Sequence, residues 1–184
     1  MQETHRKSVT FVLGGVRSGK SRFAEKLASR ASSVAFVATA KPSDAEMSAK
    51  IKRHQDERPK HWHTFEEPLE IARTLTEQGS DYELFLIDCL TIFAANLLDP
   101  EAAGSVSIET RIDQFCDALR STPSAIILVS NEVGSGVVPA YPAGRQFRDL
   151  LGEINQRVAA LADNVLLMVA GLPLVLKGEL EANP

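Results

Sequence analysis

Residues 9–21 decide the fold: they read VTFVLGGVRSGKS, a mostly apolar run of five residues that leads directly into a glycine-rich loop. The loop, residues 14–21, fits the pattern G-x-x-x-x-G-K-[ST], whose glycines allow a tight turn with backbone N–H groups facing a phosphate chain. In this pattern Lys20 reaches the β- and γ-phosphates, and the hydroxyl of Ser21 is a hard oxygen ligand for Mg²⁺. Because the loop stands between an expected strand and an expected helix, we predict a nucleotide phosphate site rather than a chance match.

The rest of the chain repeats this alternation of strand and helix. Short, continuous apolar runs predict strands buried on both faces at residues 9–13, 34–38, 84–87, 125–129 and 165–169. Three- and four-residue spacing of apolar side chains predicts helices at residues 21–31, 68–77, 108–119 and 147–162. We expect one domain, residues 1–184, with an α/β fold of the P-loop NTPase type: a doubly wound, mostly parallel sheet with helices on both faces.

Composition excludes several classes of protein. The 24 Asp and Glu residues outnumber the 20 Lys and Arg residues, giving a net charge of −4 that disfavours binding to nucleic acid. The longest apolar run, residues 165–176, is interrupted by Gly171 and Pro173 and is shorter than the roughly 20 residues of a membrane helix. Cys89 and Cys116 are the only cysteines, and they form no disulfide framework or metal motif. We expect a cytoplasmic protein with no membrane span and no nucleic-acid partner.

A carboxylate follows the third expected strand. Asp88 comes directly after the apolar residues 84–87, as in the Walker B element, where an aspartate supports the Mg²⁺ of the nucleotide. The alternative is that Asp88 caps a helix beginning near Leu90. Given the upstream loop, we favour the metal role, and Thr91 is a weaker candidate of the same kind.

One histidine stands out among the four in the chain. His54 follows Met47 and Ile51 at helical spacing, which by itself favours a histidine packed in the core. The functional alternative is an imidazole held near the phosphates, since neutral imidazole is a competent nucleophile at phosphorus. His61 and His63 lack a third ligand nearby, so we expect them in a solvated or packed loop rather than in a metal site.

The connection after the fourth strand combines acids, amides and glycines in the sequence NEVGSGVVP, residues 131–139. Because ligands of such sheets bind beyond the carboxyl ends of the strands, a polar lid facing the substrate is one interpretation. An ordinary surface loop is the other. Arg145, Arg148 and Asp149 follow at the start of the next helix, and for the two arginines a substrate role and a solvated helix face stay equally open.

Seven segments together resemble one family. GGVRSGKSRFAE, FVATA, RHQDERPKHWHTFEEP, LIDCLT, SNEVGSGVVP, FRDLLGEINQRVA and AGLPLVLK occur in this order between Gly14 and Lys177. They resemble the bifunctional adenosylcobinamide kinase/adenosylcobinamide-phosphate guanylyltransferases of cobalamin biosynthesis over nearly the whole chain. The Arg-Ser within the phosphate loop, the His-x-x-x-Arg-Pro segment and the Asn-Glu-Val-Gly segment are the most specific parts.

The resemblance implies two reactions and a set of residues. Such enzymes phosphorylate the aminopropanol hydroxyl of adenosylcobinamide with GTP or ATP, and then attach GMP from GTP to that phosphate through a GMP–histidine intermediate. The family's histidine maps onto His54, and Lys20 and Asp88 complete the expected catalytic set, with Mg²⁺ at Ser21 and Asp88. The family's nucleotide contacts map onto Gly14, Gly15, Val16, Arg17, Ser18, Gly19, Lys20, Ser21, Ala38, Thr39, Ala40, Gln55, Asp56, Glu57, Arg58, Glu66 and Asp88. The family also forms homotrimers.

Two rival hypotheses predict different behaviour. A plain small-molecule kinase, with a structural His54, would transfer the γ-phosphate and never carry a covalent nucleotide. A nucleotide-dependent switch or ATPase subunit with a protein partner would hydrolyse nucleotide without a small-molecule acceptor. For the favoured hypothesis, attack at the γ-phosphorus in one step and at the α-phosphorus in the other implies that the nucleotide, or the segment bearing His54, takes two positions.

Overall fold

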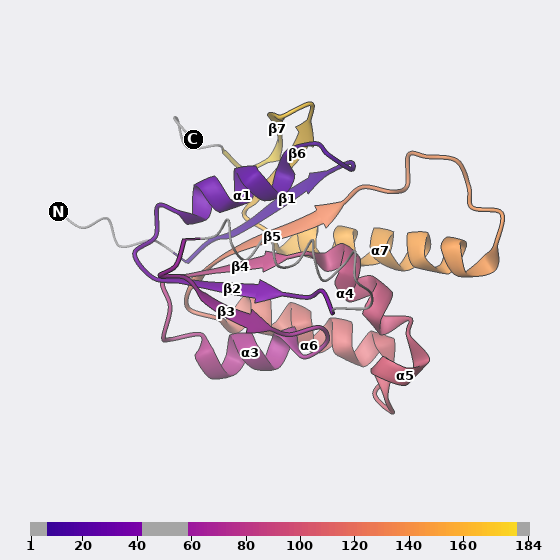
Figure 1. Ribbon diagram of the computed structural model, residues 1–184, viewed down its shortest axis with the longest axis horizontal. Coiled ribbons are helices and arrows are strands. Elements are labelled where there is room, and N and C mark those ends of the chain that lie inside the picture. Colours follow the sequence, from indigo (N-terminus) through magenta and orange to yellow (C-terminus); the bar gives the residue numbers. More distant parts are fainter. Residues whose placement is uncertain (1–6, 42–58, 180–184) are drawn as a thin grey trace.

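The computed structural model describes residues 7–41 and 59–179, and Figure 1 shows a central sheet with helices packed around it. The strands are β1 (Val9–Gly14), β2 (Val34–Ala38), β3 (His63–Glu66), β4 (Leu84–Asp88), β5 (Ala125–Asn131), β6 (Asn164–Val169) and β7 (Leu172–Lys177). The helices are α1 (Lys20–Ala28), α3 (Ile71–Gln78), α4 (Leu90–Leu97), α5 (Pro100–Ala103), α6 (Ile108–Ser121) and α7 (Pro142–Leu161). All five strands expected from the sequence are present, and β1, β4 and β5 continue slightly beyond their apolar runs.

The described strands form one sheet in the order β3-β2-β4-β5-β1-β6-β7. Every neighbouring pair is parallel except β6 and β7, which are antiparallel. The chain leaves β1 toward β2 and β4 on one side and returns to β6 on the other. The prediction of a doubly wound, mostly parallel sheet is therefore confirmed, and β1, which carries the phosphate loop, lies inside the sheet between β5 and β6.

Side chains of the sheet alternate between two apolar cores, which explains why the inner strands are continuously hydrophobic. On one face, residues such as Val12 and Leu86 pack with Ala24 of α1. On the other face, Phe11 and Phe85 pack with buried residues of α3, α4, α6 and α7. Helices thus cover both faces, as expected, and α1 lies over β1, β4 and β5. The face covered by α1 is the one on which the phosphate loop opens into a helix.

The apolar run over residues 165–176 folds as an antiparallel hairpin of β6 and β7. Val169 pairs with Leu172 across a two-residue turn, in which Ala170 and Gly171 have positive φ of 51° and 82°. Positive φ at both central residues is typical of the turns whose twist matches a hairpin. Pro173 is tolerated because β7 is an edge strand. Within the described part of the chain, no helix is both long enough and apolar enough to span a bilayer.

Candidate active site

The loop between β1 and α1 has the backbone of an anion-binding turn. Arg17 and Gly19 have positive φ of 58° and 91°, a conformation that helps consecutive N–H groups face a common centre. The N–H of Ser18 donates to the carbonyl of Gly15 across 3.3 Å, and the ammonium of Lys20 donates to the same carbonyl across 3.1 Å. The loop is therefore closed upon itself, and the N-terminus of α1 adds its positive dipole end.

Two neighbouring strands hold the loop from outside. The N–H of Gly171, in the β6–β7 turn, donates to the carbonyl of Ser18 across 2.9 Å. The N–H of Glu132, just beyond β5, donates to the carbonyl of Gly14 across 3.2 Å. Because these carbonyls have partners outside the loop, they are held away from a position where they would repel phosphate oxygens. The hairpin turn is a contributor that the sequence pattern of the loop does not reveal.

Gly14 is the loop glycine that the structure requires for space. A Cβ atom there would lie 2.9 Å from the carbonyl oxygen of Met168 on β6 and would also meet the hydroxyl of Ser18. A Cβ at Gly15 would meet no atom within 4 Å. Ser18 itself is 7% exposed, and its hydroxyl has no hydrogen-bond partner among the described residues.

Asp88 ends β4 on the face covered by α1. Leu84 and Leu86 belong to the core beneath α1, and strand alternation puts Asp88, two residues further on, on that same face. The capping alternative does not describe this structure, because α4 starts at Leu90 and its N-cap residue is Cys89, with no side-chain cap. Asp88 is half-buried. The metal role of Asp88 stays a prediction, and the side chain lies on the face of the sheet that this role requires.

Thr39 is fully buried and ties the end of β2 to the start of α4. Its hydroxyl donates to the carbonyl of Cys89 across 2.8 Å and accepts from the N–H of Cys89 across 2.9 Å. The side chain of Asn96 donates to the carbonyl of Thr39 across 2.9 Å. These contacts turn the Thr39 side chain inward. Ala38 is buried and Ala40 is partly exposed, so a nucleotide contact here stays a prediction.

Neither cysteine is poised as a nucleophile. Burial, reinforced by the neighbouring charge of Asp88, raises the pKa of the Cys89 thiol to about 11. Burial also raises the pKa of Cys116. Both thiols therefore stay protonated at neutral pH, and the thiolate is the reactive form.

The edge strand β3 brings Glu66 to the carboxyl edge of the sheet, opposite Ala38 of β2. Glu66 is exposed, and its contact with nucleotide stays a prediction. The adjacent Glu67 has a structural role, because its carboxylate accepts from the N–H groups of Leu69 and Glu70 just before α3. Of the two acids, Glu67 therefore supports the start of α3, while Glu66 stays the candidate for a nucleotide contact.

Five predicted site residues lie outside the described residues: His54, Gln55, Asp56, Glu57 and Arg58. The other histidines in this region can be placed. His63 lies on β3, where its ring stacks on Phe65 with centroids 4.6 Å apart and its Nδ1 lies 2.8 Å from the hydroxyl of Tyr82. His61 is exposed. His63 thus packs within an aromatic cluster.

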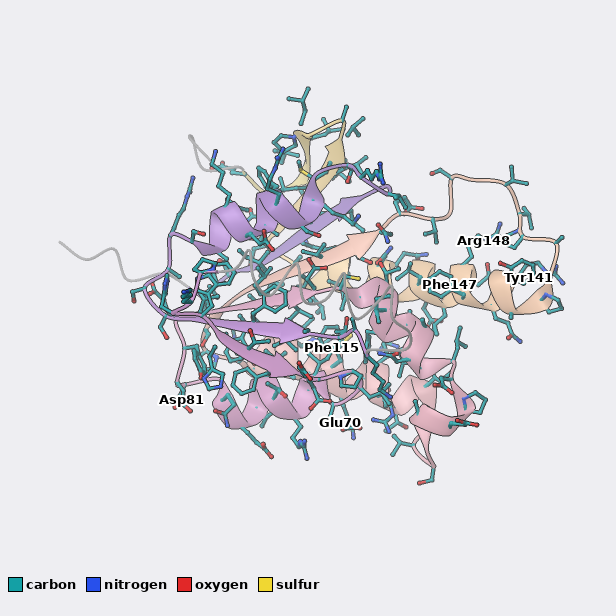
Figure 2. The ribbon with its side chains drawn as sticks, in the orientation of Figure 1. Glu70, Asp81, Phe115, Tyr141, Phe147 and Arg148 are labelled. Carbon is teal, nitrogen blue, oxygen red and sulfur yellow. The ribbon has the colours of Figure 1, made fainter. Side chains whose placement is uncertain are left out.

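The connection from β5 to α7 is apolar at its tip rather than polar. Val137 is 96% exposed and Tyr141 is 65% exposed. Arg145 donates to two carbonyls of this connection, at Pro139 and Ala140, and so shapes the loop. Figure 2 shows Tyr141 and Arg148 at the end of α7 that projects beyond the sheet. A lid function for the loop stays a prediction.

The oxygen donors of the site suit a nucleotide-bound magnesium ion. Ser21 lies in the first turn of α1, and Asp88 ends a strand against which α1 packs. Mg²⁺ prefers hard oxygen ligands and usually keeps several waters, with phosphates supplying other positions, so few protein ligands are needed. In residues 7–41 and 59–179 there is no group of three or more His, Cys, Asp or Glu side chains that would hold a metal by itself.

Comparison with known proteins identifies the family. The family described as cobinamide kinase/cobinamide phosphate guanyltransferase matches residues 10–176. The chain belongs to this family. It is accordingly an enzyme of the cobinamide kinase and guanyltransferase type, which agrees with the resemblance carried by its motifs.

Curated relatives of the cobinamide kinase family match over almost their whole length. The bifunctional adenosylcobalamin biosynthesis protein CobP of Pseudomonas aeruginosa is 42% identical over 172 residues, covering 91% of this chain and 96% of the relative. The corresponding CobU proteins of Salmonella typhimurium and Escherichia coli are 40% and 37% identical over 177 residues, each covering 90% of this chain and 98% of the relative.

Solved structures agree on the fold of this family member. An ATPase from the type III secretion system of pathogenic bacteria has a TM-score of 0.53 at 12% identity, covering 88% of this chain and 51% of its own. A Pyrococcus horikoshii protein has a TM-score of 0.54 at 7% identity, covering 97% of this chain and 90% of its own. At these identities the similarities bear on the α/β fold alone.

Proposed function

We propose that this enzyme phosphorylates adenosylcobinamide with a nucleoside triphosphate and then transfers GMP from GTP to the product, giving adenosylcobinamide-GDP. The observation that carries the proposal is a braced phosphate loop, with Lys20 and Ser21 at the start of α1 and Asp88 on the same face of the sheet. The family supplies the identity of the acceptor. The loop supplies the machinery that both reactions need.

In the first reaction, an oxygen of the acceptor hydroxyl forms a bond to the γ-phosphorus, and the hydroxyl proton is released to solvent. The bond between that phosphorus and the β–γ bridging oxygen breaks, and a nucleoside diphosphate leaves. The N–H groups of residues 14–21 and the ammonium of Lys20 stabilise the negative charge on the phosphates. We propose that GTP and ATP both bind in this cradle.

Ser21 and Asp88 are the residues that would hold Mg²⁺, directly or through water. When bound, the ion would supply charge neutralisation on the phosphate oxygens and help to align them. Asp88 is half-buried at the end of β4, so its carboxylate oxygens are open to such a contact.

In the second reaction, we propose that an imidazole nitrogen of His54 attacks the α-phosphorus of GTP. A phosphoramidate bond forms, the bond to the pyrophosphate oxygen breaks, and pyrophosphate leaves. An oxygen of adenosylcobinamide phosphate then attacks the same phosphorus and releases the histidine. Two displacements replace one difficult step, which is the general advantage of covalent catalysis.

The remaining features follow the resemblance. We propose that Gln55, Asp56, Glu57, Arg58 and Glu66 contact the guanine nucleotide, together with the backbone of residues 38–40. The two attack points imply two positions of the nucleotide or of the His54 segment. We further propose that residues 1–184 act as one domain, that the enzyme is a homotrimer and that it works in the cytoplasm.

The decisive experiment supplies adenosylcobinamide and GTP to the enzyme and separates the products by mass. Adenosylcobinamide phosphate and adenosylcobinamide-GDP are both expected. In parallel, GTP labelled at the α-phosphate should mark the protein while γ-labelled GTP should not, and the label should be lost in acid and survive in base.

The variant His54→Ala separates the two activities. It should lose the α-label and the GDP-linked product while it still phosphorylates adenosylcobinamide, since γ-transfer needs the cradle rather than that imidazole. Circular dichroism must show that the variant is folded. Wild-type protein that never takes the α-label in the presence of Mg²⁺ would leave a plain kinase as the function.

A further inference from the structure

Asn131 occupies the place between the two parts of the site that the proposed function uses. Strand β5 lies between β1 and β4 in the sheet, so its carboxyl end separates the phosphate loop from Asp88. Asn131 is the last residue of β5 and pairs in register with Gly14, the first residue of the loop. A residue at this point reaches a nucleotide held by the loop if its side chain lies on the right face.

Strand alternation puts the Asn131 side chain on that face. Ile127 and Val129 of β5 belong to the core beneath α1, and Asn131 continues the same alternation. Ser130 lies on the opposite face, where its buried hydroxyl donates to the side chain of Asn155 in α7. Asn131 therefore shares with Asp88 the face on which α1 begins.

The backbone of Asn131 is clamped from two helices. Its N–H donates to the hydroxyl of Thr91 in α4 across 2.9 Å, and its carbonyl accepts from the side chain of Asn155 in α7 across 3.0 Å. Asn155 is itself buried. Thr91 and Asn155 thus both fix the backbone of Asn131. Such rigid support is typical of a residue that must hold a precise position against a reacting group.

The side chain of Asn131 is unsatisfied within the described residues. Its Oδ1 is buried from solvent and has no hydrogen-bond partner there. A buried polar atom without a partner costs about 1–3 kcal/mol, so a water, an ion or a ligand that bonded to this atom would stabilise the site. The terminal torsion of an asparagine side chain is broad, so a turn about it can carry the amide toward a ligand.

We propose that Asn131 is a further catalytic residue, whose side-chain amide contacts the transferring phosphoryl group between the phosphate loop and Asp88. Its Nδ2 donates to an oxygen of the γ-phosphoryl group, and its Oδ1 accepts from the hydroxyl that attacks. The contact orients the attacking oxygen and stabilises charge on the group in flight. The inference rests on the proposed kinase step and adds to it the residue that lies between nucleotide and acceptor.

The test compares Asn131→Ala with the wild-type enzyme in phosphorylation of adenosylcobinamide. Loss of one such donor should lower kcat about 10²- to 10³-fold, with a much smaller change in KM for the nucleotide. Formation of the α-labelled protein should fall far less, because attack at the α-phosphorus does not use the γ-phosphoryl contact. Ser124→Ala is the matched control, since it loses buried hydrogen bonds to the carbonyls of Gly79 and Tyr82 at the opposite end of β5 and should keep kcat near wild type.

A binding measurement gives a readout independent of turnover. Asn131→Ala should weaken the binding of a non-hydrolysable GTP analogue but leave GDP affinity unchanged, because only the analogue carries a γ-phosphoryl group. Equal losses for GDP and the analogue, or a common loss of both half-reactions with a lower Tm, would make Asn131 a structural residue and overturn the proposal. The two proposals can fail separately. If the wild-type enzyme had no kinase activity but Asn131→Ala still weakened binding of the GTP analogue alone, the proposed function would be refuted, while the contact between Asn131 and the γ-phosphoryl group would stand.

Discussion

Substituting Gly14 by alanine tests whether close packing, rather than backbone freedom, determines the geometry of the phosphate loop. The new methyl group would lie 2.9 Å from the Met168 carbonyl oxygen and 3.1 Å from the Met168 Cβ, and it would also meet Ser18. The Met168 atoms belong to β6, a strand inside the sheet that cannot move without disturbing its neighbours.

Overpacking of this kind costs about 1–3 kcal/mol of unfolding free energy. For a chain of this length, that corresponds to a fall in Tm of about 2–12 °C. The steric overlap with Met168 is relieved most easily if the loop moves outward, so nucleotide affinity should fall as well. Gly15→Ala is the matched control in the same loop: its Cβ meets nothing within 4 Å, and its Tm should stay within about 2 °C of wild type.

Thermal unfolding followed by circular dichroism, without nucleotide, measures both variants under identical conditions. Titration with a fluorescent GTP analogue then measures the affinity. If Gly14→Ala melted at the same temperature as Gly15→Ala and bound nucleotide equally well, the argument from the close approach of β6 to the loop would be refuted.

Four further outcomes are expected. Lys20→Ala should lower both the kinase rate and the guanylyl-transfer rate at least 100-fold, since one charge serves both reactions. Lys26→Ala, in the last turn of α1, is the control and should change neither rate. Near-normal kinase turnover in Lys20→Ala would contradict a phosphate site shared by the two reactions. Asp88→Asn should keep the fold and shift the magnesium titration to higher concentrations, and an unchanged titration would remove Asp88 from the metal site. Because the pKa of Cys89 is raised to about 11, iodoacetamide at pH 8 should alkylate it far more slowly in folded than in denatured protein. Equal alkylation rates in the two states would contradict a raised pKa for this thiol. The raised pKa also means that the unfolding free energy should fall from about pH 9 to 11, where only the thiol of the unfolded chain ionises.

The inner strands were predictable because burial on both faces leaves a continuous apolar signature. Strand β3 lacks it: of His63, Thr64, Phe65 and Glu66, only one is apolar, as suits an exposed edge. Strand β7 is apolar, but it continues the run of β6, and the Ala170-Gly171 turn between them lacks the usual Asn-Gly signal.

The phosphate loop was predictable because its residues are contiguous and their chemistry is local. The contacts that position it are not local. Gly171 reaches Ser18 from the far end of the chain, and Thr39 bonds to Cys89 across 50 positions. Asn131 lies in the segment 131–139, which the sequence offered as a polar lid or a surface loop. Its position between the phosphate loop and Asp88 follows from the place of β5 between β1 and β4, and strand order depends on tertiary packing.

The hydrogen bond from Gly171 to Ser18 links the nucleotide cradle to the outermost strand of the sheet. That strand presents Leu172, Leu174 and Leu176 to the surroundings with half or more of each side chain exposed. A tag, linker or reporter fused after β7 that displaced this strand would also displace the turn that supports the loop. Fusions at this end should therefore be tested for nucleotide affinity, because a normal yield and a normal melting curve do not report the geometry of the loop.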